Sequence, residues 1–379
     1  MAAAYLAEMA SLVQELVRVE HRSELEWLIL LRGADTLGRK LVDELLTSTG
    51  AYLVPHRGFD RFLDVRVGIA IADQLPSVRS VPQLEQCADA ALAGAIMHKK
   101  HAVLADDGLV ARAAEQIRKL QRLARATDAD FHMHYQPIVR LATRETVGYE
   151  ALLRWKTEDG IMTPGYFLEA FEETSLLWPV GRTVIADAVN ELKRGIHKVL
   201  GDDGFVTINL SKRQLLDPDI VAVFRRAADA GIDLQKVWIE VREDFVIRLE
   251  SSAARTIEYL HDLGCRICID DLGKGYSALS YVRDFPIDVL KVDNSLIAQV
   301  MTNDTDLAVV RAICDVANAV GIETVAEGIE SDTVLPILER LGLDYGQGYY
   351  FGYPEPPEIA FGGGGPGGIP PSEKPFTDQ

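Results

Sequence analysis

Polar side chains that could bind cations follow a series of apolar runs in the C-terminal part of the sequence. They stand at or just past the ends of these runs: Glu150, Asn209, Glu240, Asp270, Asp271, Lys291, Asp293, Glu327 and Gln347. The oxygen donors among them are carboxylates and amides, ligands that favour hard cations such as Mg²⁺ or Mn²⁺ over Zn²⁺. The set is therefore typical of divalent-cation chemistry.

Converging carboxylates would need a positive charge among them. Two like unit charges about 4 Å apart repel by roughly 4 kcal/mol at an effective dielectric of 20. Neighbouring residues on a regular strand point to opposite faces, so we expect one of Asp270 and Asp271 to lie in the following loop, where the pair bridges two cation positions. Two cations about 3.5 to 4 Å apart can stabilise the attacking and leaving oxygens of a displacement at phosphorus. Lys291 could then position an attacking water or help to deprotonate it.

The elements that position these side chains alternate between short apolar runs and helical segments. Strands are predicted over residues 134–139, 147–153, 205–210, 236–241, 266–270, 288–293, 322–327 and 345–351. The alternation is typical of a parallel sheet with crossover helices, and about 230 residues with eight repeats suit a (β/α)8 barrel. The carboxyl ends of barrel strands share one face, so the polar residues should meet there.

Composition and charge narrow the class of protein. The chain has 57 acidic and 39 basic residues among 379, a net charge of -18, which argues against nucleic acid polymers and anionic membranes as partners. No run of about 18 apolar residues is present, and no basic region precedes the N-terminal apolar residues, so neither a membrane span nor a signal peptide is predicted. We expect a cytoplasmic protein.

Changes in pattern along the chain predict its domain boundaries. Residues 1–107 are interpreted as a small α/β domain with a helix over 4–17, strands over 25–31 and 64–72, and a helix over 82–97. A basic linker helix covers 108–127; a solvated linker is favoured, and a coupling or dimer helix is the alternative. The barrel covers 128–357, and 358–379 is a flexible Gly/Pro-rich tail.

Residues 130–356 resemble the EAL domains, which are cyclic-di-GMP phosphodiesterases with a (β/α)8-like barrel. The resemblance runs in order through "YQPIV", "YEALLRW", "INLSKRQ", "DDLGKGYSAL", "LKVD", "AEGIE" and "QGYYFGYP". It implies hydrolysis of one phosphodiester bond of cyclic-di-GMP to give linear pGpG. It also implies a homodimer formed through the region of the "DDLGKG" loop.

The resemblance further implies roles for individual residues. One divalent cation, Mg²⁺ or Mn²⁺, would be held by Glu150, Asn209, Glu240 and Asp270, and a second by Asp270, Asp271 and Glu327. Glu150 and Glu327 would serve catalysis together with Lys291, which would hold the water. Gln136, Arg154, Asp293 and Gln347 would line the substrate site. Glu243 would steady the "DDLGKG" loop.

The sequence departs from the family pattern in two motifs. In "EVRE", Arg242 replaces a threonine, and in "DDLGKG", Leu272 replaces a phenylalanine and Lys274 a threonine. These changes predict attenuated turnover, and they keep open a receptor that binds cyclic-di-GMP without cleaving it. Glycoside hydrolysis needs only two carboxylates and would leave Asn209 and Lys291 without a role.

Two further features have more than one interpretation. Arg154 could pair with Glu158 on the surface or contact a substrate phosphate, for which its planar guanidinium is suited. His132 and His134 share one face of a predicted strand, but no other histidine is placed to join them in a metal site. A structural role is therefore favoured for the two histidines.

The first 107 residues resemble the latter part of a GGDEF domain, the diguanylate cyclase partner of EAL domains. The segments "VRVGIAIA" and "LEQCADAALAGAIM" carry this resemblance. At the signature position the chain has "SELEW", without the paired glycines that let a backbone approach a triphosphate. We therefore expect a degenerate regulatory or dimerisation module without cyclase activity.

Overall fold

A computed structural model of the chain describes residues 16–23, 26–31, 51–56, 59–172, 174–217, 219–243, 251–273 and 285–362. The chain divides into two compact units, Met1–Gln121 and Arg122–Gln379. The division falls inside the predicted linker, near the end of helix α4 (Asp107–Leu123). Within the described ranges, no helix combines the length and apolar character that crossing a membrane requires.

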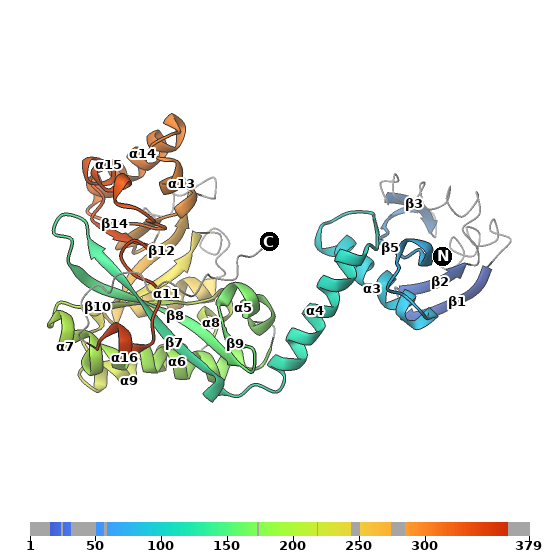
Figure 1. The fold of residues 1–379 in the computed structure, drawn as a ribbon, viewed down its shortest axis with the longest axis horizontal. Coiled ribbons are helices and arrows are strands. Elements are labelled where there is room, and N and C mark those ends of the chain that lie inside the picture. Colours follow the sequence, from blue (N-terminus) through green and yellow to red (C-terminus); the bar gives the residue numbers. More distant parts are fainter. Residues whose placement is uncertain are drawn as a thin grey trace. The chain divides into compact units, whose positions relative to one another are not determined.

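Among its described residues, the first unit has pairs of short strands and a long helix that precedes α4 (Figure 1). Antiparallel pairs are formed by β1 (Leu16–Ser23) with β2 (Glu26–Leu31) and by β3 (Ala51–His56) with β4 (Phe59–Asp64); β5 (Val67–Ile69) and β6 (Ala102–Leu104) pair in parallel. Helix α3 (Val81–Met97) starts after Ser80, whose hydroxyl accepts a hydrogen bond from the backbone N–H of Gln83. The predicted helix over 4–17 lies mostly outside the described residues, and its last two positions belong to β1 instead.

The predicted eight-stranded barrel is confirmed in the second unit. Its strands are β7 (Phe131–Arg140), β8 (Thr146–Thr157), β10 (Phe205–Asn209), β11 (Val237–Arg242), β12 (Arg266–Leu272), β13 (Val289–Val292), β14 (Glu323–Ala326) and β15 (Tyr345–Gln347). Each strand pairs with the next, β15 pairs with β7, and β8 pairs with β10, so the sheet is closed. A short strand, β9 (Gly160–Met162), pairs antiparallel with the last residues of β8 and is not one of the eight barrel strands.

The direction of the first barrel strand corrects the prediction of a wholly parallel sheet. Strand β7 runs antiparallel to both of its neighbours, β15 and β8. Only residues 141–145 connect β7 to β8. A connection this short can join antiparallel strands, whereas a parallel crossover needs a dozen residues or more. The N-terminal half of β7 therefore lies at the same end of the barrel as the carboxyl ends of the other strands.

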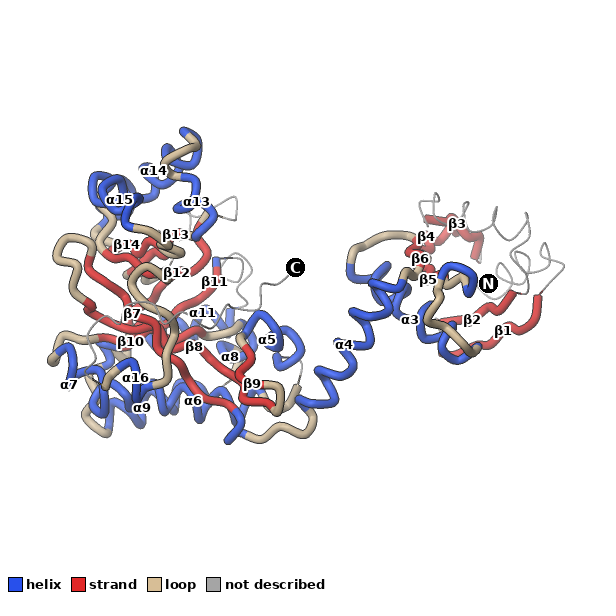
Figure 2. Tube along the Cα trace, in the orientation of Figure 1, coloured by secondary structure: helices blue, strands red, loops and turns tan. Residues whose placement is uncertain are grey.

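Helices follow most of the parallel strands and surround the sheet (Figures 1 and 2). They are α5 (Pro164–Glu172), α6 (Leu177–Glu191), α7 (His197–Leu200), α8 (Lys212–Leu215), α9 (Ile220–Asp229), α11 (Ser251–Asp262), α13 (Asn294–Gln299), α14 (Asp304–Val320), α15 (Leu335–Leu341) and α16 (Pro357–Ala360), and a π-helical turn over Leu192–Ile196 joins α6 to α7. Helix α14 shows how the sequence sets such boundaries. The Asn303 side chain accepts hydrogen bonds from two backbone N–H groups at its start, and Gly321 ends it with a φ of 76°.

An apolar layer closes the barrel interior below the carboxyl ends of the strands. It is one buried cluster with members from seven strands: Ile138, Phe205, Trp238, Cys268, Val289, Val325 and Tyr345. The rings of Phe205 and Trp238 stack with centroids 3.7 Å apart and an interplanar angle of 8°. This layer is called the barrel floor below.

The floor explains which polar side chains face the barrel interior. Alternate residues of a strand share a face, so the interior positions above the floor are two residues away from its members. Residue 240 is two positions after Trp238, residue 291 two after Val289, and residue 347 two after Tyr345. Strand β7 runs the other way, so residue 136 is two before Ile138. Glu240, Lys291, Gln347 and Gln136 therefore belong to the next layer of the interior.

Gly148 on β8 makes room for the floor. A Cβ atom at this position would lie 2.3 Å from the Phe205 ring. Gly148→Ala should therefore lower the free energy of unfolding by about 1–3 kcal/mol, the usual cost of overpacking. Urea unfolding followed by circular dichroism would measure this. Adding Phe205→Leu should recover part of the loss; a double variant that loses the sum of both single effects would contradict the steric explanation.

Candidate active site

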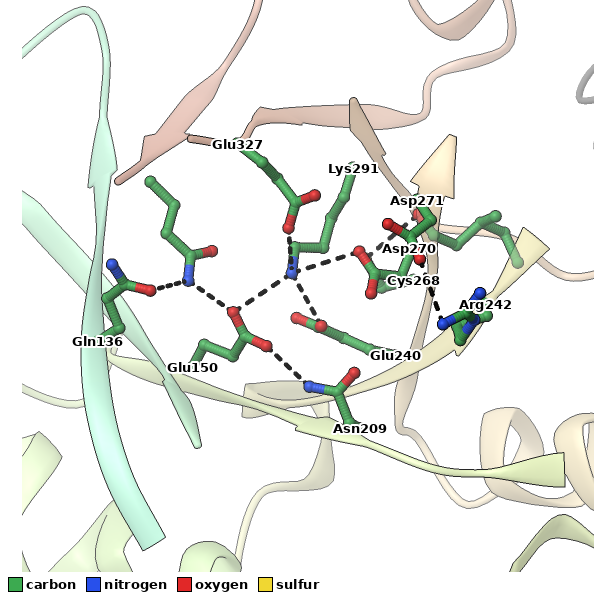
Figure 3. Close-up of polar contacts among 12 residues, drawn as sticks. Gln136, Glu150, Asn209, Glu240, Arg242, Cys268, Asp270, Asp271, Lys291 and Glu327 are labelled. Atoms are coloured by element: carbon green, nitrogen blue, oxygen red, sulfur yellow. Dashed lines mark hydrogen bonds and ion pairs between the residues drawn. The ribbon is translucent and has the colours of Figure 1, made fainter. Parts of the chain in front are cut away.

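The ammonium of Lys291 lies at the centre of the polar layer (Figure 3). Its Nζ is 2.7 Å from Glu327 Oε1, 2.8 Å from Glu240 Oε2, 3.4 Å from Glu150 Oε2 and 3.6 Å from Asp270 Oδ1. Lys291 is 1% exposed, so water screens these contacts little. Four carboxylates, three from strands and Glu327 from the position just after β14, thus share one buried positive charge.

Glu150 connects this cluster to the amides of neighbouring strands. Its Oε1 accepts a hydrogen bond from Asn209 Nδ2 at 2.7 Å, and its Oε2 accepts one from Gln347 Nε2 at 2.5 Å. Gln347 Nε2 also donates to Gln136 Oε1 at 2.9 Å, and Gln136 Nε2 donates to the carbonyl of Gly352 at 3.0 Å. Gln136 and Gln347, predicted to line the substrate site, therefore hold Glu150 in place.

The pKa values of Glu240 and Glu150 are shifted in opposite directions. Burial and the charge of Glu150 raise the pKa of Glu240 well above its ordinary value. Burial alone would also raise the pKa of Glu150, but the Lys291 charge and the hydrogen bonds from Gln347 and Asn209 outweigh it, and this pKa is lowered. Burial opposes the charge of Lys291, yet the surrounding carboxylates raise its pKa well above the ordinary range. Lys291 is thus an ammonium in the cation-free cluster.

Glu327 titrates near neutral pH in this cluster. Burial, opposed by the charge of Lys291 and reinforced by that of Asp270, raises the pKa of Glu327 to about 8. The group therefore exchanges a proton within the range in which the protein can be handled. A cation that binds to it must displace that proton.

The stability of the cation-free protein should fall as the pH rises from 6.5 to 8.5. The folded pKa of Glu327 lies above the ordinary value, so its contribution is fully present below the unfolded pKa and is lost as the pH rises through 8. Urea unfolding in chelator should show a loss of about 1–2 kcal/mol over this range. Saturating Mn²⁺ should remove the dependence. A slope of equal size in Glu327→Gln would show that another group is responsible.

Asp270 and Asp271 both belong to strand β12, which corrects the expectation that one of them lies in the following loop. The pairing of β12 with β13 shifts register between Ile269 and Leu272, and Asp271 has a φ of 60°. This left-handed conformation is uncommon for a residue other than glycine. The bulge breaks the regular alternation, which brings both carboxylates to the mouth of the barrel (Figure 3).

A second group of carboxylates lies beside the lysine cluster. Asp271, Asp293 and Glu327 each offer an oxygen, and these atoms all lie within 4.8 Å of one another. The sequence placed Asp293 with the substrate residues and Asp270 in this group. In the structure, Asp293 is 3% exposed and caps α13 by accepting a hydrogen bond from the Ser295 backbone N–H at 3.0 Å. The only cue in the sequence was its position at the end of a strand.

The donor atoms of the two groups suit hard divalent cations. All are carboxylate oxygens, with the Asn209 amide beside them, and neither imidazole nor thiolate takes part. Within the described part of the chain, Glu240 Oε1 is buried without a hydrogen-bond partner, and Asp270 Oδ1 is buried with only its 3.6 Å ion pair to Lys291. Unsatisfied buried oxygens are costly, and a cation would satisfy them. The residues present therefore fit Mg²⁺ or Mn²⁺.

Arg154 presents a buried positive charge on β8, on the same face as Glu150. It is 7% exposed, and its Nη1 donates to the carbonyl of Leu153 at 2.9 Å. Among the described residues no carboxylate lies within ion-pair distance of it, and the predicted alternative of a pair with Glu158 is not observed. A buried guanidinium without a counter-ion is costly, which makes Arg154 suited to an anionic ligand.

The structure also answers the question of the two histidines on β7. The rings of His132 and His134 lie with centroids 5.2 Å apart, and His134 Nδ1 is 3.2 Å from the carbonyl oxygen of Pro354. Burial lowers the pKa of His134 to about 4, so this ring is neutral at physiological pH. His134 therefore links β7 to the segment after β15, which supports the favoured structural interpretation for this residue.

The remaining predicted residue, Glu243, lies directly after β11. It is 3% exposed, and its Oε2 accepts a hydrogen bond from the backbone N–H of Gly273 at 3.3 Å. It therefore contacts the first part of the "DDLGKG" segment. Lys274 and the rest of that loop lie outside the described residues.

Sequence reasoning missed one contact in this region. Arg242 Nη1 lies 3.7 Å from Asp271 Oδ2. The sequence marked Arg242 only as a departure from a family motif. Its place two residues after Glu240 and four after Trp238 could have put it on the interior face of β11, but the distance to Asp271 depends on the bulge in β12.

Comparisons with known proteins agree with this geometry. The sequence profile of the EAL domain matches residues 118–354. A protein of Pseudomonas aeruginosa named bifunctional diguanylate cyclase/cyclic di-GMP phosphodiesterase MucR is 32% identical over 256 residues, which cover 67% of this chain and 37% of that protein. The chain spans about a third of the length of the curated relatives that it matches.

Solved structures extend the similarity to three dimensions. The EAL enzyme Bd1971, in a form bound to cAMP and cyclic-di-GMP, superposes with a TM-score of 0.62 and 31% identity, over 66% of this chain and 69% of that one. The PaMucR phosphodiesterase in complex with c-di-GMP gives a TM-score of 0.59 and 30% identity, over 65% of this chain and 99% of that one.

Proposed function

The chain belongs to the EAL-domain family, and on this premise we propose that its barrel hydrolyses one phosphodiester bond of cyclic-di-GMP to give linear pGpG. The observation that carries the proposal is the buried cluster of four carboxylates around Lys291, with the uncompensated Arg154 on the same face of β8. The barrel mouth thus combines hard oxygen donors for divalent cations with a guanidinium suited to bind phosphate. This combination suits displacement at phosphorus.

Two divalent cations, Mg²⁺ or Mn²⁺, would be held by Glu150, Asn209, Glu240 and Asp270 on one side and by Asp270, Asp271 and Glu327 on the other. When bound, such a pair stabilises the charge that develops on the attacking and leaving oxygens. The closeness of Asp293 to Asp271 and Glu327 makes Asp293 a further candidate ligand beside its proposed place in the substrate site.

Lys291 would act as a donor and a fixed charge. Burial opposes the charge, but the surrounding carboxylates raise the pKa of Lys291 in the cation-free cluster, so its ammonium can orient a water by donating a hydrogen bond. Glu327 has a pKa of about 8 in the cation-free cluster, and a cation that binds to it would displace its proton. Gln347 and Gln136 would keep Glu150 oriented through the hydrogen bonds described above.

Arg154 would bind a phosphate of the substrate. A guanidinium donates in a planar fork that matches phosphate oxygens, and burial strengthens the interaction because little water competes. The anionic substrate would supply the counter-ion that Arg154 lacks among the described residues.

A second candidate function is a receptor that binds cyclic-di-GMP without cleaving it. The contact between Arg242 and Asp271 favours it, since an arginine competes with a cation for that carboxylate. We also propose that residues 1–107 form a regulatory module, that the protein forms a homodimer through the barrel domain and that it is cytoplasmic. These three proposals are compatible with both functions.

Incubating the purified protein with cyclic-di-GMP tests the proposal directly. We expect pGpG to form with Mn²⁺, and no product to form in the presence of chelator. Arg154→Gln should weaken cyclic-di-GMP binding about 30- to 100-fold in calorimetry, as expected for a buried charge-assisted contact. Tyr259→Phe, an exposed substitution on α11, serves as the control. Tight binding without pGpG in any cation would leave the receptor and exclude the enzyme.

A further inference from the structure

Arg242 ends strand β11 at the rim of the carboxylate groups. Strand alternation puts it on the face of Trp238 and Glu240, and in the sheet it stands directly opposite Asp270 of β12. Its Nη1 reaches Asp271 Oδ2 at 3.7 Å (Figure 3). A positive side chain is therefore held at one edge of the group formed by Asp271, Asp293 and Glu327.

Asp271 is the carboxylate that both Arg242 and a divalent cation would contact. It is one of the three residues whose oxygens lie within 4.8 Å of one another. Its φ of 60° and the register shift of β12 hold it out of the regular strand. The bulge therefore places the Asp271 side chain where Arg242 reaches it and where its oxygen lies close to those of Asp293 and Glu327.

Arg242 is much more exposed than Lys291, the other positive side chain of the site. The Lys291 side chain is 2% exposed and surrounded by four carboxylates, so it cannot leave without exposing them. The Arg242 side chain is 52% exposed, so water solvates its charge far more than that of Lys291. An ion pair this exposed is weak and is screened by salt.

We propose that Arg242 is a tethered counter-ion that competes with a divalent cation for Asp271. This inference rests on the proposed function, because it assumes that the group of Asp271, Asp293 and Glu327 binds a cation. Arg242 lowers the cation affinity of that group by occupying Asp271 and by repelling the incoming charge. The threonine that the resembling family carries at this place has no charge, so the effect would be particular to the arginine.

Mn²⁺ binding followed by electron paramagnetic resonance tests the inference without measuring turnover. At low salt, Arg242→Thr should bind Mn²⁺ at the group of Asp271, Asp293 and Glu327 about five- to tenfold more tightly than the wild type, and Arg242→Gln should behave in the same way. Raising the ionic strength to about 0.5 M should reduce the difference to about twofold, since the screening length then falls to a few ångström.

Arg213→Gln is the matched control. The charges of Arg213 and Arg242 both oppose the rise that burial causes in the pKa of Glu172, so both guanidinium groups lie in the same neighbourhood. Arg213 contacts the carbonyl of Glu172 and the ring of Trp178, and no ion pair joins it to Asp271 among the described residues. Its removal should leave Mn²⁺ affinity within about twofold of the wild type.

Each outcome has a distinct meaning. Equal Mn²⁺ affinity in wild type and both Arg242 variants would overturn this inference and leave the proposed function intact. Unchanged Mn²⁺ affinity with weaker cyclic-di-GMP binding would make Arg242 a substrate contact and also overturn it. Absence of Mn²⁺ binding in every protein would overturn the proposed function together with the inference.

Discussion

Lys291→Met is expected to lower the free energy of unfolding of the cation-free protein by about 3–5 kcal/mol, the usual cost of removing one partner from a buried ion pair. Four carboxylates would then face one another with no positive charge among them. The loss should shrink at acid pH, where the carboxylates become protonated, and it should shrink when Mn²⁺ is added. Urea unfolding in chelator and in Mn²⁺ would measure both effects.

The same substitution should lower the hydrolysis of cyclic-di-GMP by at least about 10³-fold, because it removes a preorganised donor and charge from the reaction site. Lys236→Met is the control: Lys236 pairs with the exposed Asp203 at 3.1 Å, so its removal should change stability by less than about 1 kcal/mol. A Lys291→Met protein that unfolds at the wild-type urea concentration in chelator would show that the lysine does not hold the cluster.

The barrel and the position of its site could be predicted because both follow from local patterns. Each strand appears in the sequence as a short apolar run, and the polar residue at its end is visible by inspection. Barrel geometry then converts position along the chain into position in space, since the carboxyl ends of the strands share one face. The convergence of Glu150, Glu240 and Glu327 needs no further information.

The central place of Lys291 was not predictable in this way. In the sequence it is one polar residue among several at strand ends. It reaches the centre because Val289, two residues before it, belongs to the barrel floor, and because the registers of β13 with its neighbours set its height in the barrel. Registers between strands far apart in the sequence are tertiary facts, which a local pattern does not encode.

Two other differences have separate physical origins. The bulge at Asp271 left no mark in "RICIDDL", which reads as a regular strand; the shift in register depends on how β12 meets β13. The direction of β7 did have a signal. The five residues between β7 and β8 are too few for a crossover, so the length of this connection predicts an antiparallel pair even where the overall alternation suggests a parallel sheet.

Glu150→Gln is expected to lower hydrolysis of cyclic-di-GMP by at least about 10³-fold with a well-folded barrel, because a neutral amide lacks the charge that a cation and Lys291 both require. The amide also conflicts with its surroundings. Both oxygens of Glu150 accept hydrogen bonds, from Asn209 on one side and from Gln347 and Lys291 on the other. Glutamine must present an NH₂ group to one of these sets of donors. Turning over the Asn209 amide can relieve the conflict on its side, which predicts a modest loss of stability, about 1–2 kcal/mol.

Product formation and Mn²⁺ affinity should therefore fall together in Glu150→Gln, while Glu158→Gln, an exposed change beyond the end of the same strand, should alter neither. Removing one negative charge should also lower the pKa of Glu240, whose rise depends in part on Glu150. The stability of the cation-free variant should for that reason vary less with pH than that of the wild type. Wild-type turnover in Glu150→Gln would mean that the carboxylate serves the fold alone, and the reaction would then have to be assigned to other residues of the barrel mouth.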